Sequence, residues 1–588
     1  MNNEKLDTPL NLSLESDENR RLKSDILSNG YDEETSTWEV IVKYHGEPTN
    51  LIEGSETADI LVNGYAIIRA TKEQLERLVL LDTVEYMELP QGLQYDVYRA
   101  KQESCILPVV SGMAALNGRG VLVAIIDSGI DYLLSDFRNE SGSRILYLWD
   151  QTIEPDSGFS GEYSIGTEFT KEEIDRAIAA ANMGNGRMDY GAARALIPSV
   201  DVSGHGTAVA GIAAGSSVSP LYRGVAPESS LIIVKLRGQR QNEPLTTDLM
   251  RGITYVIRKA LELEMPLVMN LSIGDTYGAH DGTSLLERYI DSVSGNGRNV
   301  ICIGAGNEAS ANGHTSFVPQ EQERVEFSIA AGERSINVQI WKNYVDMCEI
   351  QLEAPNGEMF VLDMQNKGRQ EWRVGNTHIL IYISPPKPYS VNEEVFFDFI
   401  PDREYIDSGI WSFVITPVSS SQHDYHLYLP GAGVRNFATR FPEPTPELTM
   451  TIPAFAGSAL TVGAYNTATD GYADFSGRDR AMGEEDRLFF ATKSKPDITA
   501  PGVGIMAPAV GGGYEAFSGT SFATPIVTGS AALLMEWGIV RGNDLFLYGE
   551  KVKAYLRKGA KPLKGDLAYP NPKTGWGALC LGGSFISQ

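Results

Sequence analysis

Short, continuously apolar segments alternate with helical patterns along much of this chain, and this alternation constrains the fold more than any other feature. The segments are Val121–Ile126, Leu231–Leu236, Leu267–Ser272 and Asn299–Ala305. Each has the length of a strand and lacks the polar alternation of a half-exposed strand, so we expect burial on both faces. A helical pattern such as Thr246–Glu264 separates them. The sequence therefore predicts an α/β fold with a parallel sheet flanked by helices.

The residues before this region indicate a separate small unit. Trp38–Tyr44, Ile60–Ala70 and Val84–Leu89 read as strands, and Thr71 is a suitable N-cap for the helix that begins after it. The polar, acidic first 35 residues are expected to be loosely ordered. Together these patterns predict a small α+β domain that is too short to be comfortably stable alone.

Between residues 320 and 450 the apolar pattern changes to a period of two. Short alternating runs, which include Ile336–Ile340, Ile379–Ile383 and Trp411–Ile415, are separated by turn residues such as Pro355-Asn-Gly. This spacing is typical of a β-sandwich or jelly roll. The α/β pattern then resumes at Ala459. We therefore predict an N-terminal arm and α+β unit (1–95), an α/β domain in two parts (96–319 and 448–588), and an inserted jelly roll (320–447).

Composition excludes several classes of partner. The chain has 588 residues, with 76 Asp and Glu against 49 Lys and Arg, which gives a formal charge of −27. Such a charge argues against binding to nucleic acid or to an anionic membrane surface. No run of 18 apolar residues and no apolar signal segment is present. We expect a monomer.

The cysteines give no sign of a disulfide scaffold or of a cysteine–zinc site. The four cysteines are far apart in sequence and form no C-x-x-C motif. We expect four buried free thiols in a reducing compartment.

Four polar residues occupy positions that suit catalysis. Asp127 directly follows a buried strand, where ligand sites of parallel sheets lie. His205 stands between two glycines at the start of a helix, and Ser521 stands at the start of another, where backbone N–H groups favour a developing oxyanion. Asn307 ends a strand and offers an amide N–H. Each residue also has a plain structural reading: a turn, a core histidine, an N-cap serine and a turn asparagine.

Taken together, the four segments resemble the subtilisin-like serine peptidases, the subtilases. The matching motifs are Asp127-Ser-Gly, Gly204-His-Gly-Thr, Ala305-Gly-Asn and Gly519-Thr-Ser-Phe-Ala-Thr-Pro, in that order. The resemblance implies that Asp127, His205 and Ser521 form a catalytic triad and that Asn307 donates to the oxyanion. It also implies a protein or peptide substrate and no cofactor.

The resemblance extends to the substrate cleft and to the N-terminal unit. Residues Leu271, Ser272, Ile273 and Gly274 resemble the edge that pairs with extended substrate, and Ala305, Gly306 and Thr451 are expected at the first specificity pocket. Residues 35–95 resemble the family's inhibitory propeptide. We expect self-cleavage after Gln94, with Leu93 and Tyr95 as alternatives.

More narrowly, the chain is similar to the clostridial germination-specific subtilases of the Csp type. The features are the propeptide without a secretion signal, Asp136-Phe-Arg-Asn-Glu, Leu148-Trp-Asp-Gln and the inserted jelly roll. This resemblance implies activation of a spore cortex-lytic zymogen. It also implies a cytoplasmic or spore-associated location in an anaerobic Gram-positive bacterium.

One segment departs from the secreted members of the family. Gly215-Ser-Ser-Val-Ser-Pro-Leu-Tyr replaces the asparagine-rich loop that builds a calcium site in those relatives, and it offers no carboxylate. We therefore expect no metal there, with the jelly roll as a substitute source of rigidity.

Two other functions remain open at this stage. The first is a catalytically silent pseudoprotease that acts as a sensor or scaffold. The second makes the inserted domain a carbohydrate-binding module. Its platform would use five aromatic residues, which are otherwise expected in the sandwich core: Trp341, Tyr344, Trp372, Tyr382 and Trp411.

Overall fold

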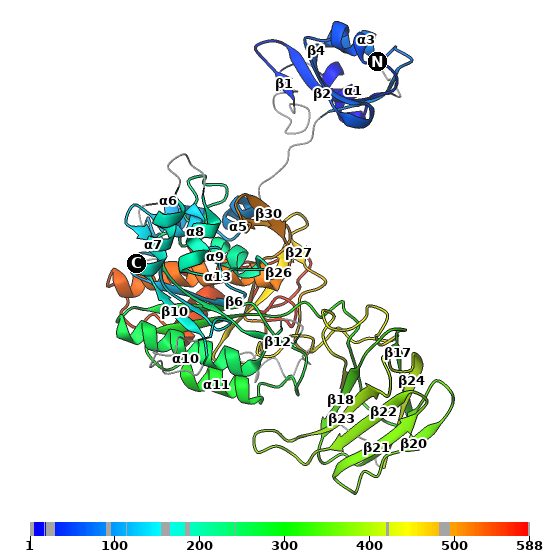
Figure 1. Ribbon diagram of the computed structural model, residues 1–588. Helices are drawn as coiled ribbons and strands as arrows, with labels where there is room; N and C mark the ends of the chain where they lie inside the picture. The colour runs from blue at the N-terminus through cyan, green and yellow to red at the C-terminus, as the bar shows by residue number, and fades with distance from the viewer. Residues whose placement is uncertain are drawn as a thin grey trace. The chain divides into compact units, whose positions relative to one another are not determined.

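The computed structural model describes residues 5–16, 18, 21, 30–89, 96–112, 115–154, 165–182, 188–240, 243–418, 423–480 and 494–585. The chain forms two compact units, residues 1–94 and 95–588. Each unit is described by itself (Figure 1).

The N-terminal unit is a small antiparallel sheet covered by helices. Its strands run in the order β1-β2-β4-β3, with β5 paired to β2. The strands are β1 (Tyr31–Asp32), β2 (Thr37–Tyr44), β3 (Thr57–Ile60), β4 (Tyr65–Thr71) and β5 (Val84–Glu88), and the helices are α1 (Thr8–Glu15), α3 (Thr49–Gly54) and α4 (Lys72–Leu78). The predicted N-cap is confirmed, because the Thr71 hydroxyl accepts from the Gln74 N–H in a capping box.

The expectation of a loosely ordered arm is wrong for residues 8–15. Asp7 caps α1 by accepting from the Leu10 N–H at 2.8 Å. Leu6, Leu10 and Leu14 of this segment are buried in the core of the unit, together with Trp38. The three leucines follow a four-residue spacing, so one face of the helix is apolar and gains from burial against the sheet.

A largely parallel sheet forms the centre of the second unit, which we call the α/β body. Its strands run in the order β10-β9-β11-β6-β14-β15-β26-β27, and β28 also pairs with β26. The pairs from β9 through β26, and the pair β26–β28, are parallel. The strands are β6 (Leu122–Asp127), β9 (Ile145–Asp150), β10 (Thr167–Thr170), β11 (Ser230–Lys235), β14 (Leu267–Leu271), β15 (Asn299–Gly304), β26 (Leu460–Asn466), β27 (Gly471–Tyr472) and β28 (Ile498–Pro501).

Helices cover both faces of this sheet (Figure 1). Helices α9 (His205–Ala214) and α13 (Thr520–Met535) pack in one apolar core, and α10 (Thr246–Glu262) and α11 (Leu285–Val293) pack in a second core on the other face. The other described helices of this unit are α5 (Asp96–Glu103), α6 (Leu107–Ser111), α7 (Lys171–Ala181), α8 (Tyr190–Leu196), α14 (Glu550–Gly559) and α15 (Leu581–Ser584), with the 3-10 turn η2 (Ser135–Phe137) and the π-helical turn η3 (Glu536–Val540). The N-terminal unit has the 3-10 turn η1 (Val62–Gly64). The helix Thr520–Val540 is long and apolar enough to cross a membrane, but 89% of its most apolar window is buried inside the body.

The inserted domain is a sandwich of two antiparallel sheets. One sheet has the order β16-β25-β18-β23-β22-β21, and the other has the order β17-β24-β19-β20. The strands are β16 (His314–Phe317), β17 (Glu323–Ile329), β18 (Ile336–Asn343), β19 (Cys348–Glu353), β20 (Met359–Val361), β21 (Gly368–Val374), β22 (Thr377–Ile383), β23 (Asn392–Pro401), β24 (Gly409–Pro417) and β25 (Tyr425–Tyr428). Alternate residues of both sheets point inward to a core that contains Phe327, Phe397 and Trp411.

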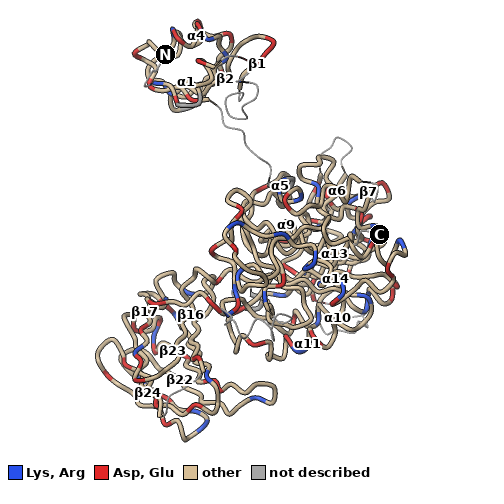
Figure 2. Tube along the Cα trace, turned by 180° about the vertical axis from the view of Figure 1, so that it is seen from behind, with Lys and Arg blue, Asp and Glu red and all other residues tan. Residues whose placement is uncertain are grey.

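Short hairpins complete the second unit. They are β7 (Arg138–Asn139) with β8 (Gly142–Ser143), β12 (Gly238–Arg240) with β13 (Glu243–Pro244), and β29 (Ile505–Pro508) with β30 (Tyr514–Phe517). Acidic residues are spread over all parts of the described chain (Figure 2).

The expectation of four free thiols is wrong. Cys105, which follows α5, forms a disulfide with Cys580 at the start of α15, and only Cys302 and Cys348 are free among the described residues. The two partners are 475 positions apart in sequence. The Leu581 N–H also donates to the Ser104 carbonyl at 2.9 Å. The first and last helical segments of the unit are therefore joined covalently and by hydrogen bonds.

Candidate active site

Asp127 and His205 lie in contact at one end of the parallel sheet. Asp127 is the last residue of β6 and is 2% exposed, and His205 is the first residue of α9. The Nδ1 atom of His205 is 2.7 Å from Oδ1 of Asp127. The same carboxylate oxygen accepts from the Ser128 N–H at 2.7 Å. A buried carboxylate thus orients the imidazole ring.

A second carboxylate, Asp201, fixes the start of α9. Its Oδ1 accepts from the Gly204 N–H and from the Ser128 hydroxyl, both at 2.9 Å, and its Oδ2 accepts from the Thr207 N–H at 2.9 Å. The sequence reasoning missed this residue. An aspartate four residues before the histidine of an apolar helix was the available signal, since carboxylates favour helix N-termini.

The glycine after His205 is required by packing. A Cβ atom at Gly206 would lie 2.2 Å from the carbonyl oxygen of Gly129. The first turn of α9 therefore packs directly on the backbone that follows Asp127. This close approach brings the imidazole to the carboxylate.

The electrostatic environment favours a protonated His205. Burial lowers its pKa, but the charge of Asp127, the hydrogen bond to Asp127 and the charge of Asp201 together outweigh burial and raise the pKa above its usual value. An imidazole whose charged form is stabilised in this way suits a group that takes up and releases a proton.

Ser521 is the second residue of α13 and so lies at a helix N-terminus. The preceding N-cap, Gly519, has φ +146°, a conformation that side chains rarely adopt. The first N–H groups of a helix have no intrahelical acceptor, so the Ser521 N–H is available to a ligand. The Ser521 hydroxyl donates to the Ser272 carbonyl at 3.3 Å.

The imidazole lies beside the helix start that carries Ser521, without a hydrogen bond to the Ser521 hydroxyl. His205 lies beside Phe522, with ring centroids 5.3 Å apart. Among the described residues no hydrogen bond joins His205 to Ser521. Such bonds are often long in a free enzyme and tighten with substrate.

Asn307 lies beside the start of the same helix. Its side-chain oxygen accepts from the Thr520 N–H at 3.0 Å and from the Thr520 hydroxyl at 3.2 Å. With the oxygen bound to Thr520, the NH₂ group of Asn307 is left as a donor. A Cβ atom at Gly519 would lie 3.3 Å from this nitrogen, so the donor lies close to the turn before Ser521.

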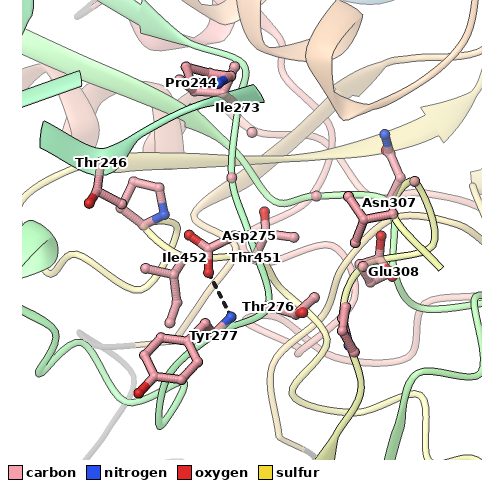
Figure 3. Close-up of a pocket in the computed structure, with 18 of the residues that line it drawn as sticks. Pro244, Thr246, Ile273, Asp275, Thr276, Tyr277, Asn307, Glu308, Thr451 and Ile452 are labelled. Carbon is pink, nitrogen blue, oxygen red and sulfur yellow. Dashed lines mark hydrogen bonds between the residues drawn. The ribbon is translucent and has the colours of Figure 1, made fainter. Parts of the chain in front are cut away.

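A cavity of about 520 Å³ adjoins Ser521 and Asn307. Figure 3 shows Asp275 and Thr451 near its middle, with Thr246 to one side and Asn307 and Glu308 to the other. The lining residues are Pro244, Leu245, Thr246, Leu249, Ser272, Ile273, Gly274, Asp275, Thr276, Tyr277, Leu286, Gly304, Gly306, Asn307, Glu308, Asn337, Gln339, Pro430, Gly431, Gly433, Val434, Thr451, Ile452, Pro453, Thr520 and Ser521. A cavity of this size accommodates side chains of an extended peptide.

Two segments form opposite walls of the cavity, residues 272–277 and residues 304–308, and Thr451 stands between them. A Cβ atom at Gly274 or at Gly306 would lie 2.5 Å from the Thr451 Oγ1 atom. The Thr451 backbone N–H donates to the Ala305 carbonyl at 3.1 Å. Both walls therefore approach the threonine as closely as glycine allows.

The other residues expected at the cleft divide into two groups. Ser272, Ile273, Gly274 and Gly306 line the cavity, whereas the side chains of Leu271 and Ala305 are fully buried in the core. Ile273 and Gly274 make no backbone hydrogen bond to other described residues, so their N–H and C=O groups are open to an extended peptide. Gln94, Leu93 and Tyr95 lie outside the described residues.

Two carboxylates of the cavity were not anticipated. Burial raises the pKa of Asp275 to about 6, although its carboxylate accepts from the Tyr277 N–H at 2.6 Å (Figure 3). Burial likewise raises the pKa of Glu308, against the opposing effects of the Ala432 N–H and the Arg435 charge. The sequence did not mark these residues, because distant segments place them: Asp275 pairs with Ile452 through the backbone, and Glu308 binds the Ala432 N–H.

The residues at the expected calcium position do not fit a metal site. The Asp136 carboxylate accepts from the Tyr514 hydroxyl at 2.7 Å, and this hydroxyl also lies 3.0 Å from the Ser217 Oγ atom. The rings of Tyr514 and Tyr222 are stacked, with centroids 4.0 Å apart. In the described part of the chain no group of three or more His, Cys, Asp and Glu side chains is arranged to hold a metal.

Comparison with known proteins agrees with this geometry. Residues 118–345 and 431–577 match the model described as the subtilase family, which covers more than half of the chain. This chain belongs to the subtilase family. Residues 4–91 match the Csp protease B prodomain. The predicted subtilisin-like fold is thus confirmed, and the subtilase match is interrupted at residues 346–430, within the inserted sandwich.

One solved structure and two curated proteins illustrate the similarity. The structure of the Clostridium perfringens CspB protease is 33% identical with a TM-score of 0.74, and the match covers 83% of this chain and 96% of that chain. The major intracellular serine protease of Bacillus subtilis is 32% identical over 167 residues, which are 28% of this chain and 49% of the relative. The PI-type proteinase of Lactococcus lactis is 23% identical over 498 residues, which are 74% of this chain and 23% of the relative. The matches thus span about half or less of these curated relatives.

Proposed function

We propose that this subtilase is a serine endopeptidase that hydrolyses peptide bonds of a protein substrate. The observation that supports this best is the 2.7 Å contact between His205 Nδ1 and the buried Asp127, beside a helix start that carries Ser521 at the edge of a peptide-sized cavity. Carboxylate, imidazole and hydroxyl in this order form the arrangement that activates a serine nucleophile.

The steps follow from the positions of these groups. A rotation about the Ser521 side chain exchanges its bond to the Ser272 carbonyl for one to His205 Nε2. The hydroxyl oxygen attacks the scissile carbonyl carbon while the imidazole takes its proton, and Asp127 stabilises the imidazolium. The imidazolium then gives the proton to the leaving amine. Water repeats the sequence on the acyl ester and restores Ser521.

The oxyanion of each tetrahedral intermediate has two donors. They are the Ser521 backbone N–H at the start of α13 and the Asn307 side-chain NH₂, whose orientation the Thr520 contacts fix. Donors that are already in place stabilise the developing charge without reorganisation, and one of them is worth about 10²–10³ in rate.

The cleft binds an extended peptide by strand addition. The open backbone of Ile273 and Gly274 pairs with the residues before the scissile bond. The side chain just before that bond enters the cavity and approaches the Thr451 hydroxyl. A hydroxyl on the pocket floor favours a polar side chain such as glutamine over Phe or Lys.

The N-terminal unit acts as an inhibitory propeptide that the enzyme removes itself. The match of residues 4–91 to the Csp protease B prodomain supports this proposal. Cleavage after Gln94 agrees with the preference for glutamine. N-terminal sequencing of wild type beside Ser521→Ala tests it: the wild type begins at Tyr95 and the variant stays uncut. A variant that is cut at the same bond would show that another protease does the processing.

The resemblance to Csp-type subtilases gives the proposed biological substrate. The enzyme activates a zymogen such as a spore cortex-lytic enzyme precursor, in the cytoplasm or in the spore. Incubation of such a precursor with wild type and with Ser521→Ala tests this. A precursor that stays intact with the labelled, active wild type would contradict the assignment of the substrate alone.

Active-site labelling decides between an enzyme and a pseudoprotease. A fluorophosphonate should label wild type at Ser521 and should not label Ser521→Ala. His205→Ala should lose activity to a similar extent, and the double variant should be no slower than either single variant, because the triad acts as a unit. A wild type that resists labelling, while folded, would favour the sensor or scaffold function.

The structure does not favour a carbohydrate platform on the inserted domain. Trp411 is fully buried and Trp341 is 3% exposed, whereas Tyr344 and Tyr382 are exposed on the surface. Trp372 is half-buried and packs against the sandwich core, so the three tryptophans contribute mainly to the interior of the second unit, as aromatic residues of β-sandwiches usually do.

A further inference from the structure

The inserted domain contributes directly to the cavity beside Ser521. The segment Pro430–Val434 follows β25 and lines the cavity, as do Asn337 and Gln339 of β18. These residues come from a domain that interrupts the α/β body, yet they share one cavity with Ser521. The insertion is thus part of the cleft.

One wall of the cleft holds this segment by hydrogen bonds, and the other holds Leu429, the residue just before it. From one wall, the Glu308 carboxylate accepts from the Ala432 N–H at 3.1 and 3.2 Å. From the other wall, the Thr276 hydroxyl donates to the Leu429 carbonyl at 3.0 Å. Glu308 directly follows the oxyanion candidate Asn307, so the segment is fixed next to the reacting groups.

The position of Gly431 shows that the segment spans the distance between the two walls. A Cβ atom there would lie 3.4 Å from Glu308 Oε1 and 3.9 Å from Thr276 Cγ2. A side chain at this position would thus contact one residue of each wall. The Arg435 Nε–H, which donates to the Pro430 carbonyl at 2.8 Å, holds the beginning of the segment from within the insertion.

From this arrangement we propose that Pro430–Val434 is the end wall of the specificity pocket and limits the length of the substrate side chain just before the scissile bond. The proposal rests on the proposed endopeptidase function and specifies its substrate class. A wall at this position ends the cavity, so the pocket selects substrate side chains of short or medium length.

Gly433 offers a direct test of the wall. A Cβ atom at this position meets no atom within 4 Å, and its φ is not in the left-handed region, so a larger side chain fits without backbone strain. Gly433→Phe places a ring at the end of the cavity. Gly295→Phe is the matched control, because that glycine also has open space, an ordinary φ and no place in the cavity.

The experiment compares peptides that differ only in the residue before the scissile bond, either Gln or Ala. For Gly433→Phe we expect the ratio of kcat/KM for Gln over Ala to fall at least tenfold, mainly through KM, because one methylene of misfit already costs about 10–200-fold. Gly433→Phe should still be labelled at Ser521 by the fluorophosphonate, which shows that it is folded, and Gly295→Phe should keep both the wild-type ratio and the wild-type rate of labelling.

An unchanged ratio in folded, labelled Gly433→Phe would overturn the proposal. If that variant fails to fold, Gly431→Ala decides, because its added methyl group lies at ordinary contact distance from both walls. A fall in the ratio of kcat/KM for the Gln peptide over the Ala peptide supports the end wall, and an unchanged ratio overturns the proposal. Failure of the proposed function is a separate result, since wild type would then neither react with the fluorophosphonate nor cut either peptide.

Discussion

The imidazole of His280 lies stacked on the ring of Tyr428, with centroids 4.1 Å apart and planes 9° apart. His280 belongs to the α/β body and Tyr428 to β25 of the insertion. The ring nitrogens of His280 lie 2.8 Å from the Met450 carbonyl and 3.1 Å from the Thr276 carbonyl. Thr276 lines the cavity and Met450 precedes Thr451, which also lines it, so one side chain joins residues at the cleft to the inserted domain.

Two more histidines complete this junction. His314 stacks on Tyr428 at 4.4 Å, and its Nε2 atom lies 3.2 Å from Nδ1 of His426. Burial lowers the pKa of His280 and of His426 to about 4, and burial with the nearby His426 holds that of His314 well below its usual value. All three are neutral in the folded protein above pH 6.5.

We expect this junction to make the second unit sensitive to acid. A histidine whose folded pKa is depressed takes up its proton only in the unfolded state between pH 6.5 and 4, so stability is complete above pH 6.5 and is lost as pH falls toward 4. Each such group contributes about 1.4 kcal/mol per pH unit within this window. Nearby charges, Asp281 for His280 and Asp424 and Arg480 for His426, modify the pKa values without reversing their direction.

The free energy of unfolding of the second unit, measured by urea denaturation at pH 7, 6 and 5, checks this prediction. Between pH 6.5 and 4, His280→Gln should reduce the dependence of the free energy of unfolding on pH by about one proton, which is about 1.4 kcal/mol per pH unit. Equal slopes for wild type and His280→Gln would contradict the assignment.

A second prediction concerns the segment that replaces the calcium loop of secreted relatives. The hydroxyl of Tyr514 donates to Asp136, and the guanidinium of Arg144 donates to the carbonyls of Asp136 and Ser229 at 2.7 and 2.8 Å. Donors from the chain itself thus satisfy oxygen atoms at this position. EDTA should therefore leave activity and Tm nearly unchanged.

Tyr514→Phe tests whether these hydrogen bonds stabilise the folded protein. The change leaves the buried Asp136 carboxylate without this hydrogen bond and should cost about 1–3 kcal/mol in the free energy of unfolding. Tyr382→Phe, at an exposed tyrosine, is the control and should cost less than about 0.5 kcal/mol.

A fall of many degrees in Tm with EDTA that calcium reverses would contradict the first of these two predictions and would show that a metal site exists.

The disulfide between Cys105 and Cys580 gives a third prediction. It closes a loop of 475 residues, and cross-links of long loops restrict the unfolded chain strongly. Cys105→Ser should lower the free energy of unfolding by about 2–4 kcal/mol under oxidising conditions. Reductant should lower that of wild type by the same amount and leave the variant unaffected, as measured by urea denaturation. Alkylation of four thiols in the unreduced, unfolded wild type would rule out the bond.

The sequence predicted the elements whose signal is local. Apolar runs such as Val121–Ile126 became central strands of the sheet, and the Thr71 cap and the alternating strands of the insertion were predicted for the same reason. Periodicity and capping act within one segment, so they can be recognised without the fold.

What the sequence did not predict depends on contacts between distant residues. The pairing of Cys105 with Cys580 and the bond between Glu308 and the Ala432 N–H join segments that only the folded chain brings together. The helix at residues 8–15 was missed because acidic neighbours concealed the spacing of Leu6, Leu10 and Leu14. Burial against a sheet outweighed the polar composition of that arm.

The last prediction separates the two ends of the Asn307 side chain. Its oxygen holds Thr520 at 3.0 Å, and its NH₂ group is the proposed oxyanion donor. Asn307→Asp keeps an oxygen for Thr520 but replaces the donor by a second acceptor, so the Tm should stay within about 2 °C while kcat falls at least 10²-fold with little change in KM. Asn307→Ala should lose a similar factor in kcat and should also lower the Tm, because it removes the acceptor of the Thr520 N–H as well. Kinetics on a peptide substrate, normalised by active-site titration, with thermal denaturation of the same samples, distinguish the two effects. If Asn307→Asp retained activity within a few-fold of wild type, the donor would be another group and Asn307 would serve only to hold the start of α13.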